Sequence, residues 1–130
     1  MIRKTRILVV DDEFRLAQFM KVSLERTSIY EVRIETNPKQ ALETAREFKP
    51  DLVFMDISMP HIDGSEVAAQ FMQDNFLKNV PIVFLTGAVS KEEVGPQGGM
   101  IGGRSFLAKP VTTVDLMTVI GRHLNPSSHA

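Results

Sequence analysis

The chain has 130 residues, of which 43% are hydrophobic and 24% are charged, and its net charge is -1. This length suits one domain with a single core, and the composition is that of a folded chain rather than a disordered one. The charge gives no long-range attraction to nucleic acid or to an anionic membrane, so we expect no direct contact with either. The chain contains no cysteine, which excludes disulfides and thiolate metal sites.

The first predicted element is a buried strand, Ile7 to Val10. This apolar run is too short for a signal peptide, and no window approaches the roughly 20 apolar residues of a bilayer-spanning helix, so we expect a cytoplasmic protein. Tyr30 to Glu35 alternates apolar and charged residues, which indicates an edge strand. The segment between them has helical periodicity, with an apolar face made of Leu16, Phe19, Met20 and Leu24.

A second helix is predicted between Asn37-Pro38, which resembles a helix start, and Pro50, which ends it. Leu52 to Met55 and Ile82 to Leu85 are then two further buried strands. The helical faces in this region are Leu42, Ala45 and Phe48, followed by Val67, Ala68, Phe71 and Met72. We expect Phe14, Phe19, Met20, Phe48 and Phe71 to pack between helices and sheet.

Ser105 to Ala108 is a short fifth strand, and a last helix, capped by Thr112 or Thr113, buries Leu116, Val119, Ile120 and Leu124. Five glycines between Gly95 and Gly103 oppose a helix before that strand, because each costs about 1 kcal/mol relative to alanine. We predict a mobile loop over 91–104, with at most one turn near Lys91 to Val94. The alternating order predicts parallel strands with helices on both faces of the sheet.

Polar residues follow four of the five predicted strands. Asp11-Asp12 follow the first, Asp56 the third, Thr86 the fourth and Lys109-Pro110 the fifth. The carboxyl ends of parallel strands share one edge of the sheet, where ligands of such folds bind, so these side chains should meet. Each residue alone is explained by helix capping or surface exposure; their agreement at four strand ends indicates a site.

Three carboxylates at one edge repel one another unless a cation is present or their pKa values shift. Mg²⁺ prefers oxygen ligands and keeps open positions that can hold a phosphoryl oxygen. A carboxylate is a competent nucleophile toward phosphorus, and Lys109 would balance the charge of the transferred group. Glu13 either flanks this site or serves as a charge in the first helical turn. The three histidines, His61, His123 and His129, have no ligand-like spacing and are expected at the surface.

Five segments together resemble the receiver domains of two-component signalling. They are Ile7-Leu8-Val9-Val10-Asp11-Asp12-Glu13, Asp51 to Pro60, Asp63-Gly64, Val83-Phe84-Leu85-Thr86 and Phe106-Leu107-Ala108-Lys109-Pro110. The resemblance implies an α/β, flavodoxin-like, doubly wound five-stranded parallel sheet with strand order 2-1-3-4-5 and, here, a fourth helix that is short or disordered. It covers residues 1–124, and 125–130 would be a tail or the start of a linker.

The resemblance also implies a role for each site residue. Asp56 is the phosphoacceptor, Lys109 contacts the phosphoryl group, and Mg²⁺ is held by Asp11, Asp12, Asp56 and the backbone carbonyl of Ser58. Thr86 and Phe106 would move on phosphorylation and change the output surface. The donor would be a phosphohistidine of a sensor histidine kinase or a phosphotransfer protein, and the phosphorylated form would act through a homodimer or a downstream effector. The domain would assist its own phosphorylation and dephosphorylation without being an enzyme of other substrates.

Two alternatives remain open from the sequence. A phosphatase with an aspartyl nucleophile also combines Asp, Thr, Lys and Mg²⁺, but its nucleophile normally follows the first strand in an Asp-x-Asp pattern, and this chain has no room for a substrate cap. A receiver-like module that binds partners regardless of phosphorylation is opposed by the complete set of site residues and favoured by the altered fourth helix.

Overall fold

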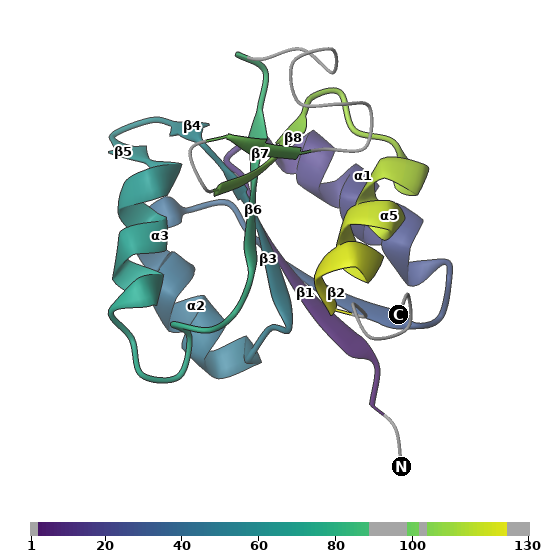
Figure 1. Cartoon of the computed structure of the whole chain (residues 1–130), viewed down its shortest axis with the longest axis horizontal. Coiled ribbons are helices and arrows are strands. Elements are labelled where there is room, and N and C mark those ends of the chain that lie inside the picture. The colour runs from purple at the N-terminus through teal and green to yellow at the C-terminus, as the bar shows by residue number, and fades with distance from the viewer. Residues whose placement is uncertain (1–2, 89–98, 102–103, 125–130) are drawn as a thin grey trace.

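In the computed structural model, which describes residues 3–88, 99–101 and 104–124, a central sheet lies between two layers of helices (Figure 1). The main sheet has six strands in the order β2-β1-β3-β6-β8-β7. They are β1 (Thr5–Val10), β2 (Tyr30–Glu35), β3 (Leu52–Asp56), β6 (Ile82–Thr86), β7 (Gly99–Ile101) and β8 (Arg104–Ala108). The helices are α1 (Phe14–Glu25), α2 (Ala41–Phe48), α3 (Gly64–Met72) and α5 (Thr113–Leu124), with a 3-10 turn η1 (Pro38–Gln40) before α2.

The five predicted strands are all present and parallel, in the predicted order, so the flavodoxin-like fold is confirmed. The central strand β3 is buried along its whole length, whereas β2 alternates buried and exposed residues over its first half, as an edge strand does. α1 and α5 cover one face and α2 and α3 the other (Figure 1). Each face therefore has its own apolar core, one centred on Phe54 and Leu116 and the other on Phe71 and Phe84.

Local sequence signals set the helix boundaries. The side chain of Asn37 accepts a hydrogen bond from the backbone N–H of Lys39 and so caps the turn that leads into α2. Lys49, at the other end of α2, adopts the left-handed conformation with φ 57°, and Pro50 follows. Thr112 and Asp115 form a reciprocal capping box at the start of α5, which selects Thr112 over Thr113 as the cap.

The sheet contains one strand more than predicted. β7 pairs antiparallel with β8 at the edge of the sheet, so the prediction of a loop over 91–104 is wrong for Gly99–Ile101 and Arg104. The number of glycines argued against a helix, but a short strand was not considered. The edge of a sheet has unpaired backbone N–H and C=O groups, which can form hydrogen bonds with such a strand. The predicted turn at Lys91 to Val94 and the predicted tail 125–130 lie outside the described residues.

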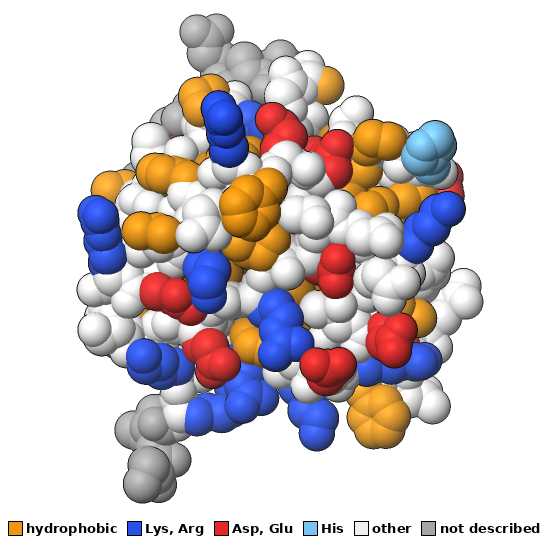
Figure 2. Space-filling view, turned by 180° about the vertical axis from the view of Figure 1, so that it is seen from behind, with side chains coloured by type: hydrophobic (Ala, Val, Ile, Leu, Met, Phe, Trp, Pro, Cys, Tyr) orange, Lys and Arg blue, Asp and Glu red, His pale blue; other side chains and the backbone are white. Residues whose placement is uncertain are grey.

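Three predicted core residues are also partly exposed. Phe14 is 58%, Phe19 43% and Met72 51% accessible to solvent. Helical periodicity places a side chain on a face but does not tell how wide the buried stripe is, and in α1 that stripe consists of Ala17, Met20 and Leu24. Seen from behind, the surface carries interspersed positive and negative side chains, which agrees with the near-zero net charge (Figure 2).

Candidate functional site

The predicted site residues lie together at the carboxyl ends of the parallel strands. Asp11 directly follows β1, Asp56 is the last residue of β3, Thr86 is the last residue of β6 and Lys109 directly follows β8. The parallel register aligns these ends, with Asp56 opposite Leu85 and Thr86 opposite Ala108. The sheet topology alone thus gathers residues that are up to 98 positions apart in the chain.

Three carboxylates form the centre of the site. One oxygen from each of Asp11, Asp12 and Asp56 lies within 4.8 Å of the others, and Asp11 and Asp56 are buried while Asp12 is exposed. Burial and the nearby charge of Asp11 raise the pKa of Asp56 to about 6. Burial also raises the pKa of Asp11, although the backbone N–H of Glu13 and the charge of Lys109 oppose the shift. The carboxylates are therefore held together at an electrostatic cost.

Lys109 connects three acidic residues. Its Nζ lies 3.3 Å from Asp11 Oδ2, 3.3 Å from Asp56 Oδ1 and 3.0 Å from Glu13 Oε1. Burial lowers the pKa of Lys109, but Glu13, Asp11 and Asp56 together outweigh it, so the pKa lies above its ordinary value and the ammonium stays charged. One cation facing several carboxylates leaves a net negative pocket. Of the two roles considered for Glu13, the structure supports contact with the site.

The donor set fits Mg²⁺. Asp11 Oδ1 accepts a hydrogen bond from the backbone N–H of Glu13 at 2.9 Å, whereas the buried Oδ2 accepts none and lies 3.3 Å from the ammonium of Lys109. This oxygen already faces one cation and would lose no hydrogen bond on coordinating a metal ion. Since all side-chain atoms of the cluster that could coordinate a metal are carboxylate oxygens, the site suits a hard dication. Asp11, Asp12 and Asp56 would hold it.

The segment after Asp56 shapes the site in a way that the sequence did not predict. A small hairpin, β4 (Ser58–Met59) and β5 (Ile62–Asp63), follows β3, and the backbone N–H of Ser58 donates to Asp56 Oδ1 at 3.3 Å. Ser58 thus lies beside the acidic cluster, and the role of its carbonyl as a metal ligand remains a prediction. His61 turns this hairpin with φ 69° and is exposed, as expected.

Gly64 fixes the position of this hairpin. Its backbone N–H donates to the carbonyl of Ile57 at 2.9 Å. A Cβ at this position would lie only 2.2 Å from the carbonyl oxygen of Asp56, so any side chain would displace the strand end that carries the acidic group. The Asp63-Gly64 pair was noted in the sequence, but without a contact map its reason could not be derived.

Thr86 and Phe106, the predicted switch pair, lie on neighbouring strands. Thr86 is buried, and its Oγ1 accepts a hydrogen bond from the backbone N–H of Ala88 at 3.0 Å. Phe106 is half-buried, and its ring lies 5.4 Å from the ring of Phe84. Gly87, the next residue, is exposed, with open space where a Cβ would stand.

Comparison with known proteins agrees with this geometry. The family model for the response regulator receiver domain matches residues 7–121. The chain belongs to this family. Among curated relatives of this receiver domain, the polar-differentiation response regulator DivK of Brucella anthropi is 32% identical over 93% of the chain and 96% of its own length. The transcriptional regulator PhoB of Pseudomonas aeruginosa is 33% identical, and the chain spans only 50% of its length.

Solved structures show the same fold. The chemotaxis protein CheY4 of Vibrio cholerae aligns with a TM-score of 0.78 at 27% identity, over 93% of this receiver domain and 99% of that chain. A putative response regulator from Chloroflexus aurantiacus aligns with a TM-score of 0.77 at 27% identity, over 94% and 98% of the two chains. In the described part of the chain, no helix has the length and apolar character required to cross a bilayer.

Proposed function

We propose that this receiver domain accepts a phosphoryl group on Asp56 from a phosphohistidine of a sensor histidine kinase or a phosphotransfer protein in the cytoplasm. The observation that supports this most directly is the placement of Lys109 Nζ 3.3 Å from a buried Asp56 carboxylate that Asp11 and Asp12 flank. Phosphoryl transfer depends on positioning and charge neutralisation, and these residues provide both.

The transfer forms one bond and breaks another. A carboxylate oxygen of Asp56 attacks phosphorus, the P–N bond to the partner's imidazole breaks, and the imidazole leaves with the electron pair and takes a proton from water. Bound Mg²⁺ supplies neutralisation of the phosphoryl charge at the acidic cluster. Lys109 already faces Asp56 and would exchange one carboxylate contact for a phosphoryl oxygen.

The same site explains how phosphorylation would reach the surface. Within the described residues, the hydroxyl oxygen of Thr86 accepts one hydrogen bond, from the backbone N–H of Ala88, and Thr86 would turn this hydroxyl toward the phosphoryl group. Phe106, on the adjacent strand, is half-buried rather than fixed in the core. Its inward movement would change the surface around β6 and β8, where a downstream effector or a second copy would bind.

Acetyl phosphate with Mg²⁺ tests the proposal without a cognate kinase. We expect wild type to gain the mass of one phosphoryl group, Asp56→Asn to gain none, and chelation of Mg²⁺ by EDTA to abolish the gain. Asp51→Asn, at the opposite end of the same strand, is the matched control and should still be labelled. Labelling of Asp56→Asn at the wild-type rate would place the acceptor elsewhere.

Partner binding separates this function from that of a phosphorylation-independent module. We expect beryllium fluoride, which mimics the phosphoryl group, to change the affinity for the partner in wild type but not in Thr86→Ala. Equal affinity with and without the mimic would favour the independent module. Turnover of a phosphomonoester would instead favour the phosphatase, and we expect none.

A further inference from the structure

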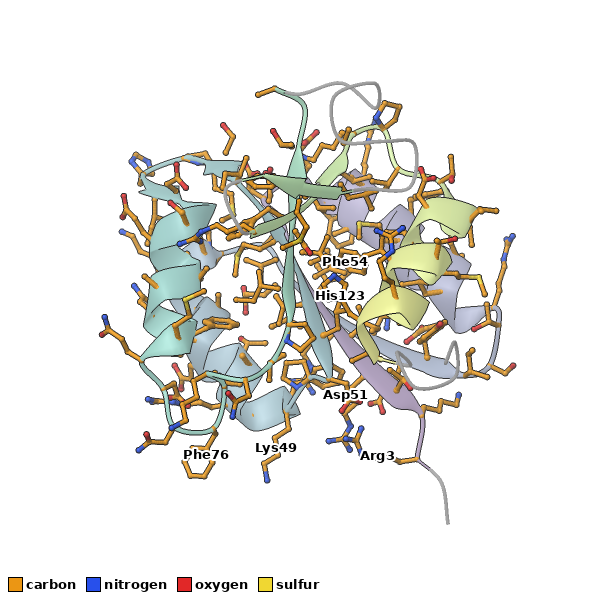
Figure 3. All side chains as sticks on the ribbon, viewed as in Figure 1. Arg3, Lys49, Asp51, Phe54, Phe76 and His123 are labelled. Atoms are coloured by element: carbon orange, nitrogen blue, oxygen red, sulfur yellow. The ribbon has the colours of Figure 1, made fainter. Side chains whose placement is uncertain are left out.

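We propose that a second ligand site, apart from the acidic cluster, binds a small carboxylic acid with an apolar body. The site is a pocket of about 260 Å³ at the amino-terminal ends of β6 and β8. Its lining includes Met72 at the end of α3, His123 near the end of α5 and Met100 of β7. His123, on α5, lies in the space between that helix and β6 (Figure 3).

Arg104, which lines the pocket, carries a buried hydrogen-bond donor that has no acceptor. Arg104 Nη1 is buried and makes no hydrogen bond. Two other buried side-chain atoms share this condition in the described residues, but Arg6 Nε lies 3.7 Å from Glu31 and Asp11 Oδ2 lies 3.3 Å from Lys109. Arg104 has no carboxylate partner in that same part of the chain. A buried charged donor without an acceptor is costly, and a ligand oxygen would remove the cost.

The Phe84 ring does not replace a hydrogen-bond acceptor for this guanidinium. Arg104 Cζ lies 5.5 Å from the centre of the Phe84 ring, within the range of a cation–π contact. Such a contact uses the positive charge of the group and does not accept a hydrogen bond from its N–H donors. The planar fork of a guanidinium matches the geometry of a carboxylate.

The charge of the lining favours an anion. Lys78 and Arg104 line the pocket, and no carboxylate does so among its described residues. Burial and the charge of Arg122 lower the pKa of His123, so its ring is neutral at pH 7 and the positive charge comes from Lys78 and Arg104. Ser105 Oγ lies 3.0 Å from His123 Nε2 and orients that ring.

The rest of the lining favours an apolar body over a simple ion. Met72, Ile82 and Met100 are part of the wall, and methionine side chains adapt to ligands of different shapes. The volume lies below the range of about 300–1,000 Å³ that is usual for drug-sized ligands, so it suits a small acid. Inorganic phosphate would leave these apolar walls without a partner. Phenylacetate is therefore a suitable probe.

Titration followed by NMR and calorimetry tests the inference on the full chain. We expect phenylacetate to bind saturably, with amide shifts centred on Arg104 and Ser105, and phenylacetamide to bind at least about tenfold more weakly because it carries no charge. Arg104→Leu should weaken binding by about tenfold or more. The affinity of Arg104→Lys should lie between those of wild type and Arg104→Leu. Lys49→Leu, at a different basic pocket that includes Arg46 and Phe76, is the matched control and should change nothing.

Several results would overturn this inference. They are the absence of saturable binding, equal binding of the amide, full affinity in Arg104→Leu, and competition by inorganic phosphate as strong as that by phenylacetate. If Arg104→Leu fails to fold, Lys78→Gln should still weaken binding several-fold. Asp56→Asn should bind phenylacetate as wild type does, so this result is independent of phosphorylation.

Discussion

The two ends of the central sheet use the same residue types with opposite electrostatic results. At the carboxyl end, Asp11 and Asp56 are buried together, and their pKa values are raised. At the amino end, Asp51 accepts hydrogen bonds from Arg3 at 2.9 Å and from the backbone N–H of Arg6 at 2.8 Å (Figure 3). Burial pushes the pKa of Asp51 up, but these bonds outweigh it and hold the pKa below its ordinary value.

The two ends of the sheet therefore differ in how their charged side chains affect the stability of the fold. The amino end ties β1 to β3 through satisfied charges, whereas the carboxyl end keeps carboxylates close to one another at the place proposed for the cation and the phosphoryl group. Perturbed pKa values of this kind are concentrated at functional sites. Removing the negative charge of an aspartate should therefore raise stability at the carboxyl end and lower it at the amino end.

The largest effect is expected from Gly64→Ala. The new Cβ would lie 2.2 Å from the carbonyl oxygen of Asp56 and 2.9 Å from Ile57 Cα, which are backbone atoms and yield only at a high cost. We expect a loss of about 3 kcal/mol in the free energy of unfolding and reduced phosphorylation of Asp56. Urea denaturation measures the loss. Gly87→Ala, which meets open space, is the control and should be nearly neutral.

Asp51→Ala should destabilise the protein by about 2 kcal/mol at pH 7, because it removes three hydrogen bonds and leaves the N–H of Arg6 without its acceptor. Glu47→Ala is the matched control: the side chain of Glu47 is 72% exposed, pairs with Arg33, and should contribute less than about 0.5 kcal/mol. Similar losses in both variants would contradict the proposed difference between anchored and exposed carboxylates.

Asp56→Asn should stabilise the metal-free protein by about 1 to 2 kcal/mol at pH 7, since the neutral side chain avoids the cost of burying a charge and the repulsion by Asp11, but loses its attraction to Lys109. The pKa of Asp56 rises from 3.8 to about 6 on folding, so wild type loses stability as the pH rises through this window. The difference in the free energy of unfolding between wild type and Asp56→Asn should be small at pH 4 and should reach its full value above pH 7. Thermal unfolding in EDTA across this range measures it.

At saturating Mg²⁺, wild type should be more stable than Asp56→Asn, the reverse of the order expected without metal. Wild type then gains stability by mass action, and Asp56→Asn, which lacks one ligand oxygen, gains less. A greater stability of Asp56→Asn at every Mg²⁺ concentration would show that the acidic cluster does not hold the ion.

The smallest effect is expected from Glu13→Gln. Glu13 is 63% exposed and contacts Lys109 at 3.0 Å, so the change in stability should be below about 0.5 kcal/mol and should vanish at high salt. Chemical denaturation at low and high ionic strength measures it. A salt-independent loss above about 1 kcal/mol would assign Glu13 a structural role.

The sequence predicted the site residues because they follow strands that could be recognised from their apolar runs. In a parallel sheet all strands have their carboxyl ends on the same side, so the residues that follow them lie close together. These residues are Asp11, Asp56, Thr86 and Lys109. The sequence could not predict contacts that depend on distances between segments, such as the close approach of Gly64 to Asp56.

The sequence also did not predict the additional strand at the edge of the sheet or the exposure of residues in α1. β7 forms because the edge of β8 offers unpaired backbone groups, and this depends on the finished sheet rather than on the propensity of glycine. The exposure of Phe14 and Phe19 depends on how much of α1 its neighbours cover, which a helical period does not reveal.

The most direct test of the account locates the phosphoryl group itself. After treatment with acetyl phosphate and Mg²⁺, reduction with borohydride converts an aspartyl phosphate to homoserine, which peptide mass spectrometry assigns to a position. The account predicts homoserine at position 56 and at no other aspartate, with none in samples that contain EDTA. Homoserine at position 11, 12 or 51, or unchanged Asp56 in a phosphorylated sample, would contradict it.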